Sequence, residues 1–379
     1  MSASLNTNIP IRGGGFLAFG EYDITNSPVP WTTGMSNLVE LGGNWIAFTP
    51  YYTYYENLNY VSLQGTSNPV WVVNGNTING SSEWYSDTHL IQLIQDAQAA
   101  GLKIMLKPMI DPYTSDSSGS WRAALDPGMS GIEAFMTTQY IPFITHYASI
   151  AEEYGVDLFC VGCELNTLIS GPDGINVWPK PSSYTTYWID SGGVIPSVRA
   201  IYSGPITYAG YPSDPAAIWE NVDYLGVDIY PQLITSNYST TDFTTLYAGA
   251  HGIANATSEY PASTIEMLAE FAGIFEKQIV LTETGFPNTP GSAYQASGIG
   301  VQAQAEQAAA VCAWVSALEC GYEWYVGMFF WGWFTPYDLR NPTDGGFNQY
   351  GTLAADAVGR CWSEQRWLKY NQTRYRITV

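Results

Sequence analysis

Two glutamates are the residues of this 379-residue chain that are best placed to do chemistry. Glu164 follows the apolar run Phe-Cys-Val-Gly-Cys, and Glu283 follows Ile-Val-Leu-Thr, so each stands where a predicted strand ends. Two carboxyl groups that face one another across a cleft are what hydrolysis of a glycosidic bond requires. A retaining enzyme needs them about 5–5.5 Å apart and an inverting enzyme about 6.5–9.5 Å, and both outcomes are open at this point.

Eight short apolar runs bounded by turn residues recur along the chain and predict eight strands. The predicted strands cover residues 15–19, 44–49, 103–108, 158–163, 205–209, 224–230, 278–282 and 326–331. Helical patterns between them are clearest at residues 88–100, 132–154, 263–276 and 302–319. This repetition of strand, helix and strand predicts parallel strands joined by crossover helices.

We expect an α/β fold of the (β/α)8 barrel type, a single domain over residues 1–379 with its long loops on the C-terminal face. A doubly wound open sheet is the alternative. A glycine-rich turn after the first strand would favour that alternative, but the run Gly13-Gly14-Gly15 leads into the predicted strand rather than following it.

In a barrel the two glutamates acquire a common position. They end the fourth and seventh predicted strands and would meet over the C-terminal mouth. Because side chains alternate along a strand, Glu164 is expected to share its face with Gly162 and Cys160. Glu283 is expected to share its face with Leu281.

Three polar residues on neighbouring strands would support the pair. Tyr230 ends the sixth predicted strand, where its phenol would hydrogen-bond the nucleophile and keep it ionised. Asp228 lies two residues deeper, and Lys107 lies on the third strand. A lone buried charge is costly, so an ion pair between Lys107 and Asp228 is favoured over a third, unpaired carboxylate beneath the glutamates.

Aromatic residues crowd the predicted mouth. Trp331 and Trp333 end the eighth predicted strand, and Tyr52 lies in the loop after the second. Flat amphipathic rings suit stacking on the faces of sugar rings. Trp331 is expected to be the platform for the sugar at the cleaved bond, and Asn166, two residues after Glu164, is a further expected sugar contact.

Composition excludes several other functions. Lys and Arg total 13 against 34 Asp and Glu, a formal charge of −21, which disfavours nucleic acid and anionic membranes as partners. No run of about 18 apolar residues is present to span a membrane. His89, His146 and His251 lack metal-binding spacing, and no Gly-x-Ser-x-Gly elbow occurs. We therefore expect a neutral substrate and no metal or other cofactor.

Five cysteines in a chain of this size are not the framework of a disulfide-stapled domain. Cys160 and Cys163 lie three residues apart on a predicted strand, so they should point to opposite faces and act as small buried hydrophobes rather than as a redox or zinc pair. Cys312 has two candidate disulfide partners in an oxidising compartment, Cys361 and Cys320.

The scarcity of basic residues suggests an acidic working environment. At low pH, protonation of carboxylates would relieve the self-repulsion of such a surface. The first ten residues show no basic region followed by an apolar one, so no signal peptide is visible. We expect an extracellular protein whose signal peptide would have been removed.

Beyond these features, the chain resembles the glycosidases of clan A, and most closely glycoside hydrolase family 113, the β-mannanases. The resemblance runs from about residue 42 to residue 290, with the motifs in matching order. They are Gly-Leu-Lys-Ile-Met-Leu-Lys-Pro-Met-Ile-Asp at 101–111, Trp-Arg at 121–122, Val-Gly-Cys-Glu-Leu at 161–165, Pro-Ile-Thr-Tyr-Ala at 205–209, Leu-Gly-Val-Asp-Ile-Tyr-Pro at 225–231 and Thr-Glu-Thr-Gly-Phe at 282–286.

By this resemblance Glu164 is the acid/base and Glu283 the nucleophile of a retaining hydrolase. Trp121, Arg122 and Asp111 match positions that line the family's cleft, where Arg122 would orient a carboxylate or a sugar hydroxyl. The resemblance implies a β-linked neutral polysaccharide or oligosaccharide as substrate, first of all β-1,4-mannan. The alternatives are a β-glucanase, an exo-acting β-mannosidase, or a barrel kept as a carbohydrate-binding or structural module.

Two positions depart from the patterns of these enzymes. Cys163 stands where many clan A enzymes have an asparagine that binds the sugar 2-hydroxyl, a residue that family 113 also lacks. Met109 stands where the family's Leu-Lys-Pro motif usually continues with histidine, which removes one polar contact and bears on the sugar preference.

Overall fold

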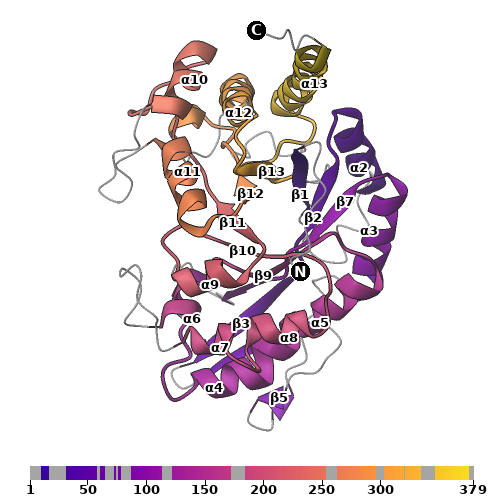
Figure 1. Cartoon of the computed structure of the whole chain (residues 1–379), viewed down its shortest axis with the longest axis vertical. Coiled ribbons are helices and arrows are strands. Elements are labelled where there is room, and N and C mark those ends of the chain that lie inside the picture. Colours follow the sequence, from indigo (N-terminus) through magenta and orange to yellow (C-terminus); the bar gives the residue numbers. More distant parts are fainter. Residues whose placement is uncertain are drawn as a thin grey trace.

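The computed structural model describes residues 10–16, 31–57, 60–64, 72–73, 76–77, 87–112, 122–171, 184–252, 263–295, 303–319, 321–333 and 346–374. Eight parallel strands close into a barrel in the order β1-β13-β12-β11-β10-β9-β7-β2 (Figure 1). These strands are β1 (Ile11–Phe16), β2 (Trp45–Phe48), β7 (Lys103–Leu106), β9 (Leu158–Cys163), β10 (Ile206–Gly210), β11 (Tyr224–Asp228), β12 (Ile279–Thr284) and β13 (Tyr325–Trp331). The predicted (β/α)8 barrel is confirmed.

Two small sheets lie outside the barrel. The larger has three strands in the order β4-β3-β8, and the smaller pairs β5 with β6. Their bounds are β3 (Tyr51–Asn57), β4 (Tyr60–Gln64), β5 (Val72–Val73), β6 (Asn76–Thr77) and β8 (Met109–Pro112). The larger sheet thus joins the segment after the second barrel strand to the segment after the third.

Helices surround the barrel strands (Figure 1). The α-helices are α2 (Trp31–Glu40), α3 (Asp87–Ala99), α4 (Ile132–Phe135), α5 (Ile141–Glu153), α6 (Asn166–Ser170), α7 (Thr186–Ile189), α8 (Val194–Arg199), α9 (Ala216–Asn221), α10 (Phe243–Gly252), α11 (Thr264–Phe275), α12 (Gln304–Leu318) and α13 (Leu353–Arg374). Short 3-10 turns are η1 (Arg122–Ala124) and η3 (Ser292–Tyr294). None of the described helices is long and apolar enough to cross a membrane.

Three predicted helices agree with α3, α11 and α12 to within two residues. α11 begins at a capping box, in which the Ser263 hydroxyl accepts from the Glu266 N–H and the Glu266 carboxylate accepts from the Ser263 N–H, both at 3.2 Å.

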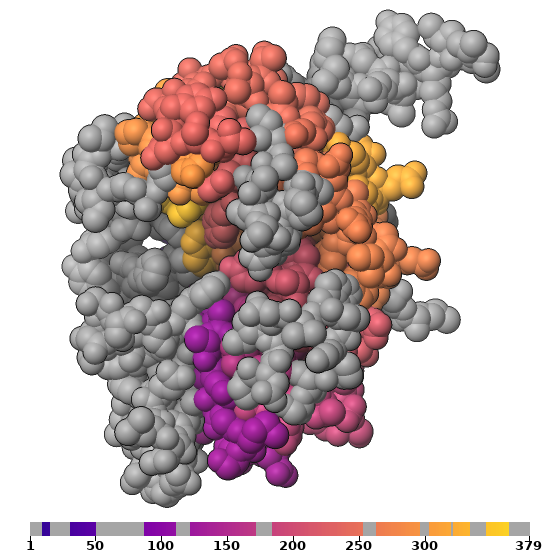
Figure 2. Space-filling view, turned by 90° about the vertical axis from the view of Figure 1, so that its left-hand side faces the viewer, coloured from indigo at the N-terminus to yellow at the C-terminus, as the bar shows by residue number. Residues whose placement is uncertain are grey.

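In the space-filling view, α10 forms the upper part of one face, and segments from the first half of the chain, in purple, lie below it (Figure 2).

The predicted helix at 132–154 is divided by a π-helical turn, η2 (Met136–Tyr140), between α4 and α5. Pro142 stands in the first turn of α5. Proline has no N–H to donate to residue 138, so the regular α-helical bonding is interrupted just before it. Tyr140 is the last residue of this π-helical turn, and its hydroxyl donates to the Val161 carbonyl of β9 at 3.0 Å.

The first strand lies earlier than predicted. β1 begins at Ile11, so all three glycines lie inside it, whereas the prediction left Gly13 and Gly14 before the strand. A Cβ on Gly13 would overlap the ring of Phe329, and one on Gly14 would lie 2.6 Å from the Cβ of Trp333. Glycine is therefore required where β1 packs against Phe329 of β13 and against Trp333, which follows β13. A run without side chains has no alternating pattern by which a strand can be recognised.

The barrel interior is filled in layers. The lower layer is apolar and takes side chains from most of the strands, among them Trp45, Leu158, Tyr224, Val280 and Phe329. Next to it lies a smaller cluster of Met109, Cys160, Cys163 and Ala209, with Trp331 packed against it. A larger core separates the strands from the surrounding helices.

One buried ion pair joins the two ends of the barrel sequence. Arg12 of β1 donates through Nε and Nη2 to the carboxylate of Glu319, at 3.1 and 2.6 Å, and through Nη1 to the Trp362 carbonyl at 2.9 Å. Both side chains of the pair are 1% exposed. β1, the end of α12 and α13 are thereby connected where the barrel closes.

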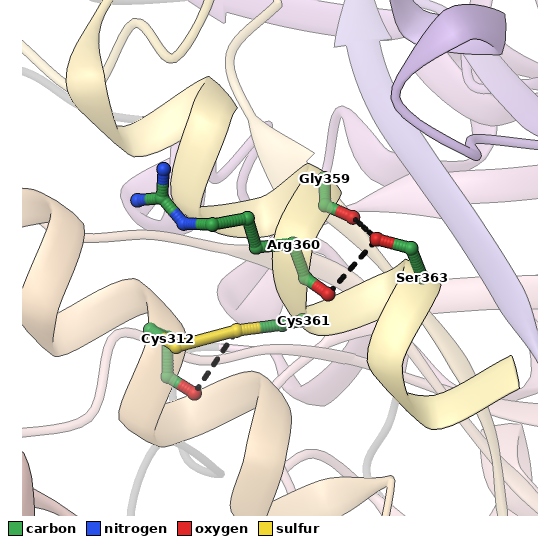
Figure 3. The surroundings of a disulfide bond; sticks show 5 residues. All are labelled: Cys312, Gly359, Arg360, Cys361 and Ser363. Atoms are coloured by element: carbon green, nitrogen blue, oxygen red, sulfur yellow. Dashed lines mark hydrogen bonds between the residues drawn. A yellow bond between two sulfur atoms is a disulfide. The ribbon is translucent and has the colours of Figure 1, made fainter. Parts of the chain in front are cut away.

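α12 and α13 lie side by side (Figure 1) and are linked by the disulfide Cys312–Cys361 (Figure 3). Of the two candidate partners of Cys312, the structure has Cys361, and Cys320 lies outside the described residues. Cys160 and Cys163 are free and buried, as expected of small hydrophobes. Burial raises the pKa of the Cys160 thiol to about 12.

Candidate active site

The fourth barrel strand is irregular directly below Glu164. Thr207 of β10 pairs with Cys160 of β9. Ala209, two residues later, pairs with Cys163, so β9 carries one extra residue. The bulge leaves Cys160 and Cys163 together in the same inner layer. The prediction that they point to opposite faces is wrong, because strict alternation holds only in a regular strand.

This bulge sets the direction in which the Glu164 side chain points. Gly162 faces the helices, where a Cβ would lie 2.9 Å from the Tyr140 hydroxyl and 3.0 Å from Trp188, so the predicted common face of Glu164 and Gly162 is wrong. Glu164 has a φ of 51°, in the left-handed region that few non-glycine residues adopt. Its N–H donates to the Ala209 carbonyl at 2.7 Å.

The seventh barrel strand has a similar irregularity below Glu283. Val227 of β11 pairs with Leu281, whereas the next residue, Asp228, pairs with Glu283, so β12 also carries an extra residue. Leu281 packs in the core under the helices, and Glu283 points into the barrel mouth. Their predicted common face is wrong for the same physical reason.

Glu164 is 5% exposed and is held by two donors. Arg122 Nη1 donates to Oε2, and the Tyr211 hydroxyl donates to Oε1, each at 2.9 Å. Burial raises the pKa of Glu164, and the negative charge of Glu283 raises it further, although both donors act in the opposite direction. A carboxyl group with a raised pKa retains the proton that a general acid must deliver.

Glu283 is 4% exposed and has different partners. Lys107 Nζ donates to Oε1, and the Tyr230 hydroxyl donates to Oε2 at 2.7 Å. A buried ammonium group and a phenol both stabilise a charged carboxylate. Both oxygens of Glu283 are therefore engaged by donors inside the barrel mouth.

Asp228 completes a buried cluster beneath Glu283. Its Oδ2 lies 3.7 Å from Lys107 Nζ, so the expected ion pair is present, and its Oδ1 accepts from the Thr282 hydroxyl at 2.6 Å. Burial raises the pKa of Asp228 well above its usual value, and the charge of Glu283 adds to the effect. Burial alone would lower the pKa of Lys107, but the surrounding acidic groups, Asp228 first, hold it well above its ordinary value.

Most of the sequence matches a known family. The model of the family described as Glycoside Hydrolase Family 113 matches residues 58–352. This chain belongs to glycoside hydrolase family 113. It is therefore a glycoside hydrolase, and the resemblance carried by its motifs is confirmed. No curated protein sequence matches it.

Solved structures share the fold of this glycoside hydrolase. A family 113 β-mannanase from Alicyclobacillus acidocaldarius in complex with ManMIm has a TM-score of 0.64 at 22% identity, over 94% of this chain and 98% of that one. A complex of a family 113 β-1,4-mannanase gives 0.62 at 18% identity, over 93% and 99%. A family 5 mannosidase from Rhizomucor miehei gives 0.57 at 8% identity, over 96% and 94%. At these identities the likeness shows the barrel fold.

The two tryptophans expected to contact sugar have different positions. Trp331 is half-buried beside the carboxylates, and its ring lies 5.5 Å from Lys107 Nζ. Trp333 is 0% exposed, and its Nε1 donates to the Gly34 carbonyl at 3.1 Å. The expectation for Trp333 is wrong. The Trp333 side chain packs against β1, where Gly14 leaves room for it, and belongs to the core.

The remaining expected contacts are placed as follows. Asn166 is the first residue of α6, beside Glu164, and its amide Nδ2 donates to Asp214. Tyr52 lies in β3 and Asp111 in β8, neighbouring strands of the three-stranded sheet, and the structure describes their backbone only. Trp121 lies outside the described residues.

Tyr211 and Asp214 are site residues that the sequence reasoning missed. A signal for Tyr211 exists, since Tyr-Pro follows the fifth barrel strand as Tyr211-Pro212 and the sixth as Tyr230-Pro231. The two tyrosines have equivalent roles, because each donates a hydrogen bond to one of the two glutamates. Asp214 has no such local signal, since it lies in an ordinary turn sequence.

A pocket of about 310 Å³ lies beside the two tyrosines. Its lining includes Tyr211, Tyr230 and Asp228 on the barrel side and Thr264 and Met267 of α11 on the other. Pockets of this size with a largely apolar wall and a few converging polar groups are typical of small-ligand sites. Glu164 and Glu283 are not part of its lining, so the pocket adjoins the tyrosines that hold the two carboxylates rather than the carboxylates themselves.

Cys163, Glu164 and Asp228 offer atoms that lie within 4.8 Å of one another, close enough to bind a metal ion together. The same atoms have cationic neighbours, since Arg122 contacts Glu164 and Lys107 contacts Asp228. Two positive charges at these positions oppose the binding of a metal cation.

Proposed function

We propose that this glycoside hydrolase is a retaining enzyme that cleaves β-1,4-mannan or its oligosaccharides, with Glu164 as acid/base and Glu283 as nucleophile. One observation carries the proposal: the two buried carboxyl groups at the ends of β9 and β12 have opposite surroundings. Burial raises the pKa of Glu164 and so favours its protonated form, whereas Glu283 faces a buried ammonium group that favours a negative charge.

In the first step, Glu164 donates its proton to the oxygen of the leaving sugar as the glycosidic bond breaks. Glu283 attacks the anomeric carbon from the opposite side and forms a covalent glycosyl ester. The Lys107 ammonium and the Tyr230 hydroxyl hold one oxygen of Glu283 each, which fixes the direction of attack.

In the second step, Glu164 acts as a base. Formation of the ester removes the negative charge of Glu283, and that charge contributes to the raised pKa of Glu164. The pKa of Glu164 therefore falls, and its carboxylate takes a proton from the water that attacks the anomeric carbon. Two inversions give a product with the β configuration of the substrate.

The choice of a neutral substrate follows from the charges at the site. Arg122 and Lys107 already contact the carboxylates, so they are engaged when substrate arrives. The pocket beside Tyr211 and Tyr230 has room for a sugar ring. Mannan is the first choice because two family 113 proteins of the same fold are a β-mannanase and a β-1,4-mannanase.

The test uses the wild-type protein, Glu283→Ala and, as a matched control, Glu270→Ala on the exposed side of α11. Each is incubated with mannan, mixed-linkage glucan and xylan at pH 3 to 7, and released reducing ends are assayed. We expect mannan to be cleaved fastest by the wild type and the control, with no release by Glu283→Ala. Proton NMR of the earliest product should show the β anomer.

Other results would replace the proposal. The α anomer as first product would make the enzyme inverting. Faster release from glucan than from mannan would make it a β-glucanase, and release of mannose alone would make it an exo-acting mannosidase. If the wild type releases nothing from any of the three, the mannanase proposal fails and the alternative of a carbohydrate-binding barrel is favoured.

A further inference from the structure

We propose that Asp214 is a positioning residue for the acid/base: it holds Tyr211 against Glu164 and ties the loop after β10 to the chain that follows Glu164. The inference rests on the role proposed above for Glu164. Asp214 does not touch the reacting atoms, and nothing in the proposed mechanism uses it.

Asp214 fixes the backbone of Tyr211 from two sides. Its Oδ2 accepts from the Tyr211 N–H at 3.0 Å, and its own N–H donates to the Tyr211 carbonyl at 2.9 Å. These bonds close a tight turn over residues 211–214. The Tyr211 side chain leaves this turn and donates to Glu164 Oε1 at 2.9 Å.

The same carboxylate also reaches the segment after Glu164. Asp214 Oδ1 accepts from the Asn166 amide, two residues beyond Glu164. Tyr208 of β10 hydrogen-bonds Asp214, and its hydroxyl also accepts from the Leu165 N–H at 2.8 Å. Both the donor to Glu164 and the backbone that carries Glu164 are therefore attached to one side chain.

The position of Asp214 is tightly confined. It is 2% exposed, and its carbonyl accepts from Trp219 Nε1 of α9 at 3.1 Å. A Cβ on Gly210, the last residue of β10, would overlap Asp214 Oδ2. Glycine at 210 therefore permits the carboxylate to approach the strand end. We call the hydrogen bonds of Asp214 to Tyr211, Asn166 and Tyr208 the clamp. This close packing leaves the clamp little freedom to move.

The clamp holds in either charge state. Among the described residues no Lys, Arg or His forms an ion pair with Asp214, and the titratable groups that face it are Glu164, Tyr208 and Tyr211. Burial raises the pKa of Asp214 to about 7.

In the acidic range the protonated group still accepts from the Tyr211 N–H. A rotated Asn166 amide would then accept from its O–H, and Asn166 Oδ1 is buried without a partner in the described structure. An asparagine side chain presents the same donor and acceptor as the protonated acid, so Asp214→Asn should preserve the clamp.

The test compares Tyr211→Phe, Asp214→Ala, Asp214→Asn and the double variant Tyr211→Phe/Asp214→Ala. Substrates are phenyl and 2,4-dinitrophenyl β-mannobiosides, because only a poor leaving group needs the proton of Glu164. We expect Tyr211→Phe and Asp214→Ala each to lower kcat/KM for the phenyl substrate by about tenfold, the effect of one hydrogen bond to a charged group. On the dinitrophenyl substrate the loss should be under about twofold, and Asp214→Asn should stay close to the wild type.

The double variant decides whether Asp214 acts through Tyr211. Residues that act as one unit give non-additive losses, so the double variant should be no worse than the poorer single variant. Additive losses, or equal losses on both substrates, would overturn the proposal and leave Asp214 a purely structural residue. If Asp214→Ala does not fold, Gly210→Ala replaces it, since its Cβ displaces the same carboxylate.

A titration separates failure of this inference from failure of the proposed function. In protein labelled with 13C at the glutamate carboxyl groups, the pKa of Glu164 is followed by NMR and assigned with Glu164→Gln. Loss of the Tyr211 hydrogen bond should raise this pKa, so Tyr211→Phe and Asp214→Ala should both raise it. If Asp214 acts only as a nearby negative charge, Asp214→Ala will lower it instead. This result is independent of whether any glycoside is cleaved.

Discussion

The ends of β9 and β12 bring the same amino acid to the barrel mouth in two contrasting settings. Each strand has an extra residue below its glutamate, and each glutamate accepts a hydrogen bond from a tyrosine that precedes a proline. The cations differ. Glu164 contacts the guanidinium of Arg122, whereas Glu283 shares the ammonium of Lys107 with a third carboxyl group, Asp228.

Under the proposed mechanism, this difference would let one barrel give two identical side chains opposite tasks. The proton state depends on the charges and the burial around each carboxyl group and not on its place at a strand end. Burial and the charge of Glu283 oppose ionisation of Glu164 more than Arg122 and Tyr211 favour it. The comparison between the two glutamates is therefore the feature to test.

The largest expected effect is the loss of activity in Glu164→Ala, and azide should rescue this variant and Glu283→Ala with products of opposite anomeric configuration. Glu164→Ala should lower kcat/KM on a phenyl β-mannobioside by about 10⁴-fold, the upper range for general acid catalysis. Sodium azide should then give a β-glycosyl azide from a dinitrophenyl substrate, because azide attacks the glycosyl ester without a base. Glu283→Ala should give the α azide, since azide occupies the place of the nucleophile. The same anomer from both variants would contradict the two assignments.

The second effect concerns stability on the Glu283 side. Lys107→Met leaves Asp228 and Glu283 buried without their cation, and we expect a loss of about 3–5 kcal/mol in the free energy of unfolding, measured with denaturant. Lys103→Met is the matched control, because its side chain is 46% exposed and pairs with Asp157 only at 3.9 Å. That control should lose under about 1 kcal/mol. Equal losses would mean that the cluster is not held by Lys107.

The third effect compares the two tyrosines. Tyr230→Phe removes a donor from the nucleophile and should lower kcat/KM by about tenfold on every aryl mannobioside, whatever its leaving group. Tyr211→Phe should act on poor leaving groups only. If the two variants depend on the leaving group in the same way, the tyrosines do not distinguish the two steps.

The smallest effect is a change in proton affinity. Glu283→Gln removes the negative charge that raises the pKa of Glu164, so this pKa should fall, as followed by 13C NMR. As the proposed general acid, Glu164 must be protonated in the active enzyme, so kcat/KM should decrease as pH rises through the pKa of Glu164. Glu270→Gln, on α11, should leave the titration unchanged. An unaltered Glu164 titration in Glu283→Gln would show that the two groups are not coupled.

The contrast also explains what the sequence could predict. Strand count, helix positions and the order of motifs were sufficient for the barrel and for both glutamates. The argument from alternation placed Gly162 on the same face as Glu164, and Leu281 on the same face as Glu283. Both placements fail because each strand carries an inserted residue. Such an insertion leaves no mark on the local amino-acid composition, so it could not be foreseen. The glutamates were found because they end their strands, and the bulges that direct them could not be recognised.

Contacts from distant segments were predictable only where a charge required a partner. Lys107 and Asp228 could be paired because two buried charges need each other. Arg122 could be expected near a carboxylate only through the resemblance to the family. Asp214 is a carboxylate without a cation partner among the described residues, so charge reasoning had nothing with which to pair it. Trp333 was misplaced because a tryptophan after a strand suits a sugar platform and a core equally well.

The ion pair of Arg12 with Glu319 has a consequence for biosynthesis. Arg12 belongs to the first barrel strand, but its partners follow 307 and 350 residues later in the chain. Closure of the barrel must therefore wait until the segment up to Trp362 has left the ribosome. Until then the growing sheet has two unpaired edges, which are sites of aggregation. Losses during production are thus expected to arise from unclosed nascent chains rather than from finished barrels that reopen.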